Sequence, residues 1–326
     1  MMLDRGPQGR IEGANDEASR DEHPSVVMRD LETRRRPPAH IITFANEKGG
    51  VGKSTFAFHC AVALAHSAMK VLVIDCDRRQ QSLYRFLEAR DGTARALKVP
   101  LPRPSHVVLD KQSGALLLQE IERLGRDWDY VLIDLAGQDS PIARRAIALA
   151  DTLVTPINCS PTDLDALGRI NPVSRHFRHA GPFAEVVTGL RAERMARGLA
   201  GFDWIVAKNR VRHCEHRLLA AVNANLATIS RHLGFRTIEG LTERVAYREL
   251  LPFGLTQLDL RHIPELGAAR STNLREMRQM VESLQLPCFG AKTRSPTFAR
   301  LSARVPERTT QNYRDAMSAA MTTRAG

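Results

Sequence analysis

The sequence predicts an α/β fold in which a doubly wound, mostly parallel sheet is flanked by helices. Short runs rich in valine and isoleucine alternate with longer helical stretches along the chain. The apolar runs lack polar alternation, as expected of parallel strands that are buried on both faces. Charged residues follow directly at the ends of several runs, and ligands of such sheets bind at the carboxyl ends of the strands.

Five strands and four helices are expected in the central part of the chain. The strands are predicted at Ile41–Ala45, Val71–Ile74, Tyr130–Ile133, Thr152–Ile157 and Trp204–Ala207. The helices are predicted at Ser54–Met69, Gly114–Leu124, Pro141–Ala150 and Arg217–Leu233. A further apolar stripe with helical spacing is expected to pack on the sheet and consists of Leu274, Met277, Val281 and Leu284.

Composition places the chain among ordinary globular proteins. It has 326 residues, of which 43% are hydrophobic and 25% are charged, enough for a sizeable core. No apolar run approaches the roughly 20 residues that cross a bilayer, so we expect a cytoplasmic protein without stable membrane insertion. The 5 cysteines include no C-x-x-C pair, which favours small core residues over disulfides or a zinc site.

The charge is unevenly distributed along the chain. Residues 1–38 carry 7 basic and 8 acidic side chains, and residues 286–326 carry 7 and 2, so the total of +11 leaves +7 on the body. Both ends lack apolar periodicity, and we predict a disordered leader at 1–38, one domain at 39–288 and a basic, disordered tail at 289–326. A basic body favours a polyanionic partner, nucleic acid before acidic membrane, although solvated arginines are an equally simple explanation.

Residues 46–55 read Asn-Glu-Lys-Gly-Gly-Val-Gly-Lys-Ser-Thr and lie between the first predicted strand and a long helix. That context is the one a phosphate-binding loop requires, because glycines let successive N–H groups face one concavity at a helix N-terminus. We expect Lys53 to reach the β- and γ-phosphates of ATP and the Ser54 hydroxyl to hold Mg²⁺. The predicted nucleotide-binding residues of the loop are Lys48, Gly49, Gly50, Val51, Gly52, Lys53, Ser54 and Thr55.

The loop departs from the usual G-x-x-x-x-G-K-[ST] pattern because Glu47 stands where the first glycine belongs. Lys48 follows it. A lysine at that position has little access to its own nucleotide's γ-phosphate while Lys53 occupies that space, but it is free to reach a nucleotide held by a second subunit. The doubled lysine therefore predicts an ATP-bound homodimer.

Two further strand ends supply acidic residues. The run Val71–Ile74 is followed by Asp75 and Asp77, and the run Tyr130–Ile133 by Asp134. A carboxylate at the end of an apolar strand is the Walker B arrangement, in which it orients Mg²⁺. We expect Asp134 to join Ser54 at the metal and Asp77 to position the attacking water or to ligate the metal.

The run from Lys48 to Ser54, taken with Asp77 and Asp134, resembles the ParA/MinD family of deviant Walker A P-loop ATPases. The likeness spans roughly residues 40–285 and includes stretches at 74–80, 155–158, 203–210 and 244–258. It implies slow ATP hydrolysis in which Lys48 and Asp77 are catalytic, Lys48 by crossing the dimer interface. It also implies that Asn209, which would contact adenine, and Arg210 bind the nucleotide.

The later stretches resemble, within that family, proteins that position the division plane. This resemblance implies a switch that binds nucleoid DNA without sequence preference, takes cues from the ParB complex and inhibits FtsZ polymerisation. The alternative is a ParA-type chromosome or plasmid segregation ATPase with the same chemistry and different cargo. A metabolic relative that holds an iron–sulfur cluster ranks last, because the cysteines lie at the wrong places.

Two features bear on that resemblance. Leu135-Ala136 stands where relatives commonly carry Thr-Pro or Thr-Ala after the Walker B aspartate. Three arginines at spacing i, i+3, i+6 are expected to line one helix face against DNA, although such a face is often merely solvated. The predicted DNA contacts are Arg191, Arg194, Arg197, Arg212 and Arg231.

Overall fold

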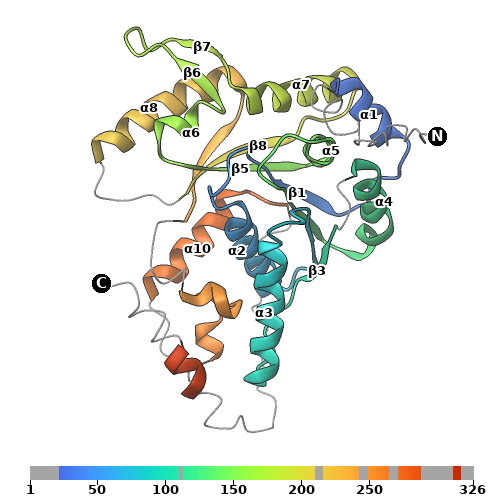
Figure 1. Cartoon of the computed structure of the whole chain (residues 1–326), viewed down its shortest axis with the longest axis vertical. Coiled ribbons are helices and arrows are strands. Elements are labelled where there is room, and N and C mark those ends of the chain that lie inside the picture. The colour runs from blue at the N-terminus through green and yellow to red at the C-terminus, as the bar shows by residue number, and fades with distance from the viewer. Residues whose placement is uncertain are drawn as a thin grey trace, which may run out of the picture.

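A seven-stranded sheet, all of whose pairings are parallel, forms the centre of the computed structural model (Figure 1). The structure describes residues 22–109, 113–209, 216–241, 249–263, 271–287 and 311–316. The strand order is β3-β2-β4-β1-β5-β8-β9. The strands are β1 (His40–Phe44), β2 (Val71–Asp75), β3 (Ser105–Val108), β4 (Tyr130–Asp134), β5 (Thr152–Asn158), β8 (Asp203–Asn209) and β9 (Arg236–Glu239). The predicted fold class is confirmed.

Helices cover both faces of the sheet (Figure 1). One face carries α2 (Lys53–His66), α3 (Ser82–Ala96) and α10 (Ser271–Ser283). The other carries α4 (Gly114–Leu124), α5 (Pro141–Leu149), α7 (Pro182–Ala196) and α8 (His216–Leu233). In α10, Met277 and Val281 are fully buried against the α2 side, so the predicted apolar stripe does pack on the sheet. None of the helices in the described ranges combines the length and apolar character that a membrane span requires.

The predicted disordered leader needs correction, because part of it is helical. Residues Pro24–Glu32 form α1, which lies over α5 and α7 (Figure 1). Val27 and Met28 of this helix are 0% and 1% exposed and belong to the core beneath it. The helix is hard to predict from its amino acids, since only these two side chains of α1 are buried. Of the predicted tail, the structure describes residues 311–316, which are helical.

A β-hairpin of strands β6 (Gly168–Ile170) and β7 (Phe177–Ala180) projects from the molecule after the short helix α6 (Pro161–Leu164) (Figure 1). It forms a separate two-stranded sheet. The sequence analysis did not predict it, because its strands are largely polar and exposed.

A buried ion pair fastens the segment 249–263, with its 3-10 turns η2 (Leu251–Phe253) and η3 (Leu260–His262), to α3. The Arg90 guanidinium donates to both carboxylate oxygens of Asp259 at 2.8 and 2.7 Å. Gly254 has a φ of +61°, and a Cβ added there would lie 2.1 Å from the Arg90 backbone nitrogen. The stretch around residues 252–256, which contributed to the family resemblance, therefore has a packing role in the fold.

Candidate nucleotide-binding site

The loop between β1 and α2 has the backbone conformation that the glycine pattern predicts. Gly50 and Gly52 have φ values of +74° and +89°, in the left-handed region that favours glycine. The Asn209 side-chain amide, at the end of β8, donates to the Val51 carbonyl at 2.8 Å. A Cβ added at Gly52 would lie 2.3 Å from that same amide nitrogen, so a larger residue would clash with the Asn209 side chain.

Asn46 fixes the other side of the loop. Its side-chain nitrogen donates to the Pro156 carbonyl of β5 at 2.8 Å, and its side-chain oxygen accepts from the Lys48 amide at 3.0 Å. Both Asn46 and Asn209 are 3% exposed. The loop is thus held open between β5 and β8 by two buried asparagines. An adenine contact by Asn209 remains a prediction, and Arg210 lies outside the described residues.

Lys53 opens α2 at the floor of the loop. It is 7% exposed, and its ammonium donates to the Lys48 carbonyl at 3.1 Å. Burial lowers the pKa of Lys53, and the charges of Asp134 and Asp77 oppose that shift. The side chain therefore lies at the glycine loop, in the position of a P-loop lysine, with two carboxylates nearby.

Asp134 ends β4 in the innermost part of the site and pairs in register with Asp75 of β2. Asp134 is 0% exposed, and burial, followed by the charge of Asp75, raises its pKa to about 8. The Ser54 hydroxyl lies close enough to lower that pKa, yet neither carboxylate oxygen of Asp134 has a hydrogen-bond partner of normal geometry. A buried carboxylate without donors is costly unless a cation compensates it.

These residues fit Mg²⁺. The Asp75 oxygens already accept from the backbone nitrogens of Asp77 and Tyr84 at 2.9 and 3.0 Å. Asp134 and the Ser54 hydroxyl remain as the oxygen ligands that a hard cation prefers. They are the pair that the sequence predicted.

Asp77 lies two residues beyond the end of β2. Its Oδ1 accepts from the backbone nitrogens of Arg79 and Gln80 at 3.1 and 3.0 Å, which orients the carboxylate in a tight turn. Its charge acts on Lys53, so the two side chains belong to one site. A role for Asp77 in hydrolysis remains a prediction.

Lys48 points away from the phosphate loop and contacts α6. Its ammonium forms an ion pair with Asp163 and lies 3.2 Å from the Thr162 hydroxyl. The Lys48 side chain is 42% exposed, whereas Asp163 is 1% exposed. The sequence analysis missed Asp163, because an aspartate in the first turn of a short helix looks like an ordinary terminal residue.

The loop that follows β4 packs directly against the phosphate loop. A Cβ added at Gly137 would lie 3.2 Å from the Glu47 carbonyl, the Gly49 nitrogen and the Lys53 ammonium. Two residues later, the Asp139 carboxylate accepts from Arg144 at 3.0 and 2.6 Å. We call residues 135–139 the switch loop. The switch loop therefore lies in direct contact with the phosphate loop.

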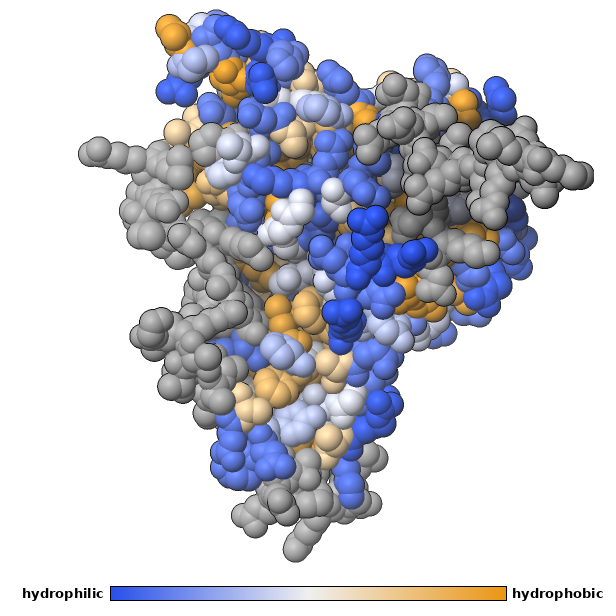
Figure 2. All heavy atoms as spheres, in the orientation of Figure 1, coloured by the Kyte–Doolittle hydropathy of each residue, from blue (hydrophilic) through white to orange (hydrophobic). Residues whose placement is uncertain are grey.

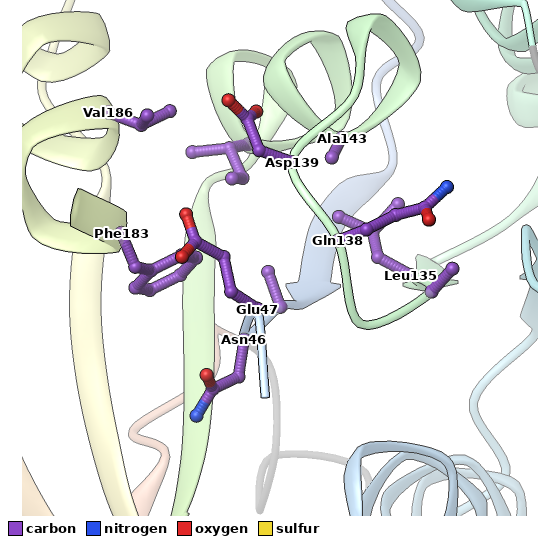
Figure 3. Close-up of a pocket in the computed structure, with 11 residues that line it drawn as sticks. Asn46, Glu47, Leu135, Gln138, Asp139, Ala143, Phe183 and Val186 are labelled. Atoms are coloured by element: carbon purple, nitrogen blue, oxygen red, sulfur yellow. The ribbon is translucent and has the colours of Figure 1, made fainter. Parts of the chain in front are cut away.

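Figure 3 shows a small pocket between the switch loop, α5 and α7, with Glu47 extending beside Phe183. Its volume is about 10 Å³, the lower limit for one water, so it is no nucleotide site. Leu135 lines it and is 3% exposed. Burial, followed by the charge of Asp139, raises the pKa of Glu47. At the position where the family resemblance implied threonine, this chain has a buried leucine and no hydroxyl.

The arginines predicted to line one face of α7 do not form an open cationic row, because they bond within the chain, and their contact with DNA stays a prediction. Arg194 is 4% exposed and donates to the carbonyls of Ala148 and Ala150 at 2.8 and 2.6 Å. Arg191 donates to two carbonyls at the end of α8 at 2.8 and 2.6 Å. Arg197 is paired with acidic side chains of α1 and α7 at 2.6 and 3.1 Å. These partners lie far away in sequence or on the helix's own surface, so spacing alone could not reveal them.

Of the two remaining predicted DNA contacts, the structure describes one, Arg231. Arg231 is exposed on α8 and donates to the Ala227 carbonyl of its own helix at 3.2 Å. Arg212 lies outside the described residues. The polyanion-binding surface is therefore not identified by the sequence pattern.

Curated relatives match part of this chain. A ParA protein of Rhizobium radiobacter is 31% identical over 127 residues, which cover 39% of this chain and 51% of the relative. The chromosome partitioning protein ParA of Caulobacter vibrioides is 26% identical over 163 residues, covering 41% and 61%. This chain thus spans between half and two thirds of the length of these relatives.

Solved structures share the fold at low identity. Apo McdA of Cyanothece superposes with a TM-score of 0.53 at 18% identity, covering 76% of this chain and 100% of McdA. The septum site-determining protein MinD of Pyrococcus horikoshii superposes with a TM-score of 0.51 at 17% identity, covering 78% and 99%. At these identities the likeness shows the fold.

The match to a family model is more extensive. The model described as ATPase MipZ matches residues 40–288, a range that includes the phosphate loop, Asp77, Asp134 and Asn209. Because the match covers most of the chain and all of the site described above, the chain belongs to the MipZ family of ATPases.

Proposed function

We propose that this protein is an ATP-dependent dimerising switch that positions the cell-division plane. In this proposal it binds nucleoid DNA and the ParB complex and inhibits FtsZ polymerisation, as a cytoplasmic, nucleoid-associated protein. The observation that carries the proposal is the pair of lysines at the phosphate loop. Lys53 is buried beneath the glycines, whereas the Lys48 side chain is 42% exposed and directed away from them.

Each residue has a distinct part in the switch. The loop amides and Lys53 bind the phosphates of ATP, and Ser54 and Asp134 hold Mg²⁺, which when bound neutralises charge on the phosphate oxygens. Lys48 leaves Asp163 and reaches the nucleotide of the partner subunit. Asp77 positions the attacking water. Slow hydrolysis then removes the γ-phosphate that favours the dimer, and the subunits separate.

Known structures and names support the nucleotide chemistry. Proteins with this fold have been solved as an ATP complex, for McdA of Cyanothece, and with Mg-ADP, for MinD of Pyrococcus horikoshii. The relative from Rhizobium is named ParA, and the one from Caulobacter is named a chromosome partitioning protein. Dimerisation, DNA binding and an effect on FtsZ are the parts that need measurement.

The first experiment is sedimentation of FtsZ polymers in the presence of this protein with ATP or ADP. Loss of polymer with ATP, and not with ADP, is the expected result. Lys48→Ala is the matched control, because it should bind ATP and leave the polymer intact. Unchanged polymer in every condition would contradict the division-positioning role.

Substitution of Lys48 should affect dimerisation, whereas substitution of Lys53 should affect ATP affinity. Lys48→Ala is expected to retain ATP affinity within about threefold but to lose ATP-dependent dimerisation in light scattering, since its loss removes a contact with the partner's nucleotide. Lys53→Gln should lose at least roughly tenfold in ATP affinity by calorimetry, because the phosphates lose their buried cation. Full dimerisation of Lys48→Ala would refute the bridging role.

The second candidate function is a ParA-type chromosome or plasmid segregation ATPase. The names of the curated relatives favour it. It predicts the same nucleotide behaviour of both lysine variants together with ATP-dependent DNA binding. It would be preferred if the protein binds DNA with ATP and leaves FtsZ polymers unchanged.

A further inference from the structure

The β6–β7 hairpin is the most prominent projection of the described chain (Figure 1). Its two strands pair from Gly168 opposite Ala180 to Ile170 opposite Phe177. Backbone hydrogen bonds continue past the strands, since Asn171 donates to the His176 carbonyl at 2.9 Å. The hairpin is therefore a complete two-stranded ribbon with a closed tip.

The hairpin is anchored firmly at its base. The Phe177 ring stacks on His232 at the end of α8, with 4.6 Å between the ring centroids. A Cβ added at Gly168 would lie 2.8 Å from the Phe177 ring, and one at Gly181 would lie 2.1 Å from the Asp165 carbonyl. These close approaches leave the ribbon little freedom to change its angle to the body.

The tip is ordered as well. The Asn171 side-chain oxygen accepts from the backbone nitrogens of Val173 and Ser174 at 2.9 and 3.2 Å. Arg175 adopts the left-handed conformation with a φ of +60°. Val173 is 89% exposed, the most exposed large apolar residue among those described. Figure 2 shows the hairpin as a mostly hydrophilic projection with a hydrophobic spot near its outer end.

The charge of the hairpin is entirely positive. Its arginines, Arg169, Arg175 and Arg178, are all exposed. Arg169 has a single exposed carboxylate, that of Asp165, at 3.8 Å, and the described residues place no carboxylate within ion-pair distance of Arg175 or Arg178. The sequence has no aspartate or glutamate at residues 166–184 or at 216–238, so the hairpin and the adjoining α8 offer cations without competing anions.

We propose that the β6–β7 hairpin is the surface by which this protein contacts the phosphates of duplex DNA. The inference rests on the proposed nucleoid binding and names the element responsible for it. A two-stranded ribbon fits the width of the DNA major groove. Guanidinium groups pair well with phosphate oxygens. Contacts of this kind carry no sequence information, so binding is independent of base sequence.

An anionic membrane is the other polyanion that an arginine-rich tip can meet, and the structure favours DNA over it. The apolar residues exposed at the tip are Pro172 and Val173. Burying one valine contributes only about 1.5–3 kcal/mol, and even a single acyl chain anchors a protein only reversibly. The hairpin has the charge for a phosphate surface and too little apolar area for insertion.

The test is DNA binding by the full chain in the presence of a non-hydrolysable ATP analogue. A labelled duplex of arbitrary sequence is titrated by fluorescence anisotropy at several salt concentrations. The double variant Arg175→Glu/Arg178→Glu should bind at least roughly tenfold more weakly at moderate salt. For Arg175→Ala/Arg178→Ala, the slope of the logarithm of the DNA association constant against the logarithm of salt concentration should become less negative by about 0.9 for each lost phosphate contact.

Arg126→Glu is the matched control. Arg126 is exposed in the turn η1 (Gly125–Asp127) directly after α4, far from the hairpin in Figure 1. Its change of charge equals that of either hairpin substitution made alone, which is half that of the double variant, and it should bind DNA within about twofold of the unchanged protein. ATP-dependent dimerisation, followed by light scattering, should be the same for all variants and shows that each is folded.

Each outcome has a distinct meaning. Weaker binding confined to the hairpin variants supports the inference. Equal binding by all variants overturns it and leaves nucleoid binding to another surface. Absence of DNA binding by the unchanged protein at low salt overturns the inference and the DNA component of the proposed function. Hairpin-dependent binding to phosphatidylserine vesicles without DNA binding would replace DNA by a membrane.

Discussion

Lys48 has two possible partners, and only one of them is in its own chain. In the structure its ammonium contacts Asp163, whose side chain is almost completely buried at 1% exposure. The second oxygen of Asp163 has no hydrogen-bond partner among the described residues. In the proposed dimer the ion pair therefore competes with the partner's nucleotide for Lys48, and dimerisation would replace one contact by the other.

Asp163→Asn should make ATP-dependent dimerisation easier, because the amide keeps the shape of the side chain and removes the charge. An exposed lysine gains at most about 1 kcal/mol from such a pair, so the dimer dissociation constant should fall by about two- to fivefold. Analytical ultracentrifugation with ATP measures it. Asp165→Asn, two residues on and exposed, is the control and should leave the constant unchanged. Weaker dimerisation of Asp163→Asn would contradict the competition.

The residues proposed to bind phosphate and Mg²⁺ could be predicted from the sequence, whereas the residues that contact them from distant segments could not. Lys53, Ser54 and Asp134 were predicted because strand ends and glycines place them by local rules. Asp163 and Gly137 act through contacts with segments distant in sequence, which no local spacing encodes. The intrachain partners of the α7 arginines could not be predicted for the same reason, since Arg194 bonds to carbonyls about 45 residues away.

Among the elements, the buried strands were the most predictable. The five predicted strands correspond to β1, β2, β4, β5 and β8 within two residues at each end, because strands covered on both faces are continuous apolar runs. The edge strands β3 and β9 are half-exposed and were missed, as was the polar hairpin. The helix α3 was missed as well, because few of its side chains are buried.

The helix α1 is held by both apolar contact and charge. Val27 and Met28 enter the core, while Arg145 donates to both oxygens of Glu22 at 2.8 and 3.0 Å and is paired with Asp30. A helix of 9 residues has little stability by itself, so this packing is what maintains it.

Met28→Ala should lower the free energy of unfolding by about 2–5 kcal/mol, because it empties a buried site under α1. Urea unfolding followed by circular dichroism measures this change. Val26→Ala on the same helix is the control, since Val26 is 39% exposed, and it should change stability by no more than about 0.5 kcal/mol. Equal and negligible effects of both substitutions would show that α1 does not belong to the folded body.

The stability of the protein as a unit also depends on buried titratable groups. His59 lies in the middle of α2 and is 0% exposed, and burial lowers its pKa to about 4, against the opposing charge of Asp259. In the unfolded chain the same imidazole takes up a proton near pH 6.5. The unfolded state therefore binds more protons between these values, and His59 destabilises the fold as the pH falls from about 6.5 to about 4.

The pH effect should appear as a difference between the unchanged protein and His59→Gln. From pH 7 to pH 5, the free energy of unfolding of the unchanged protein should fall by about 2 kcal/mol more than that of the variant. The comparison is needed because the raised pKa of Asp134 acts in the opposite direction over this range. Urea titrations without nucleotide at both values measure it, and parallel pH profiles would refute the assignment.

Arg144 connects the switch loop to the N-terminal segment. Its guanidinium donates to the Asp139 carboxylate and also to the Glu22 carbonyl. Purification strategy follows from that contact. A recombinant protein trimmed to residue 40, where the family match begins, would lose α1 and leave Arg144 and Arg145 without the N-terminal partners they have here. A nucleotide-exchange rate measured on the trimmed protein would therefore be that of a protein whose switch loop has lost part of its support. Affinity tags belong at the other terminus, with residues 22–39 retained.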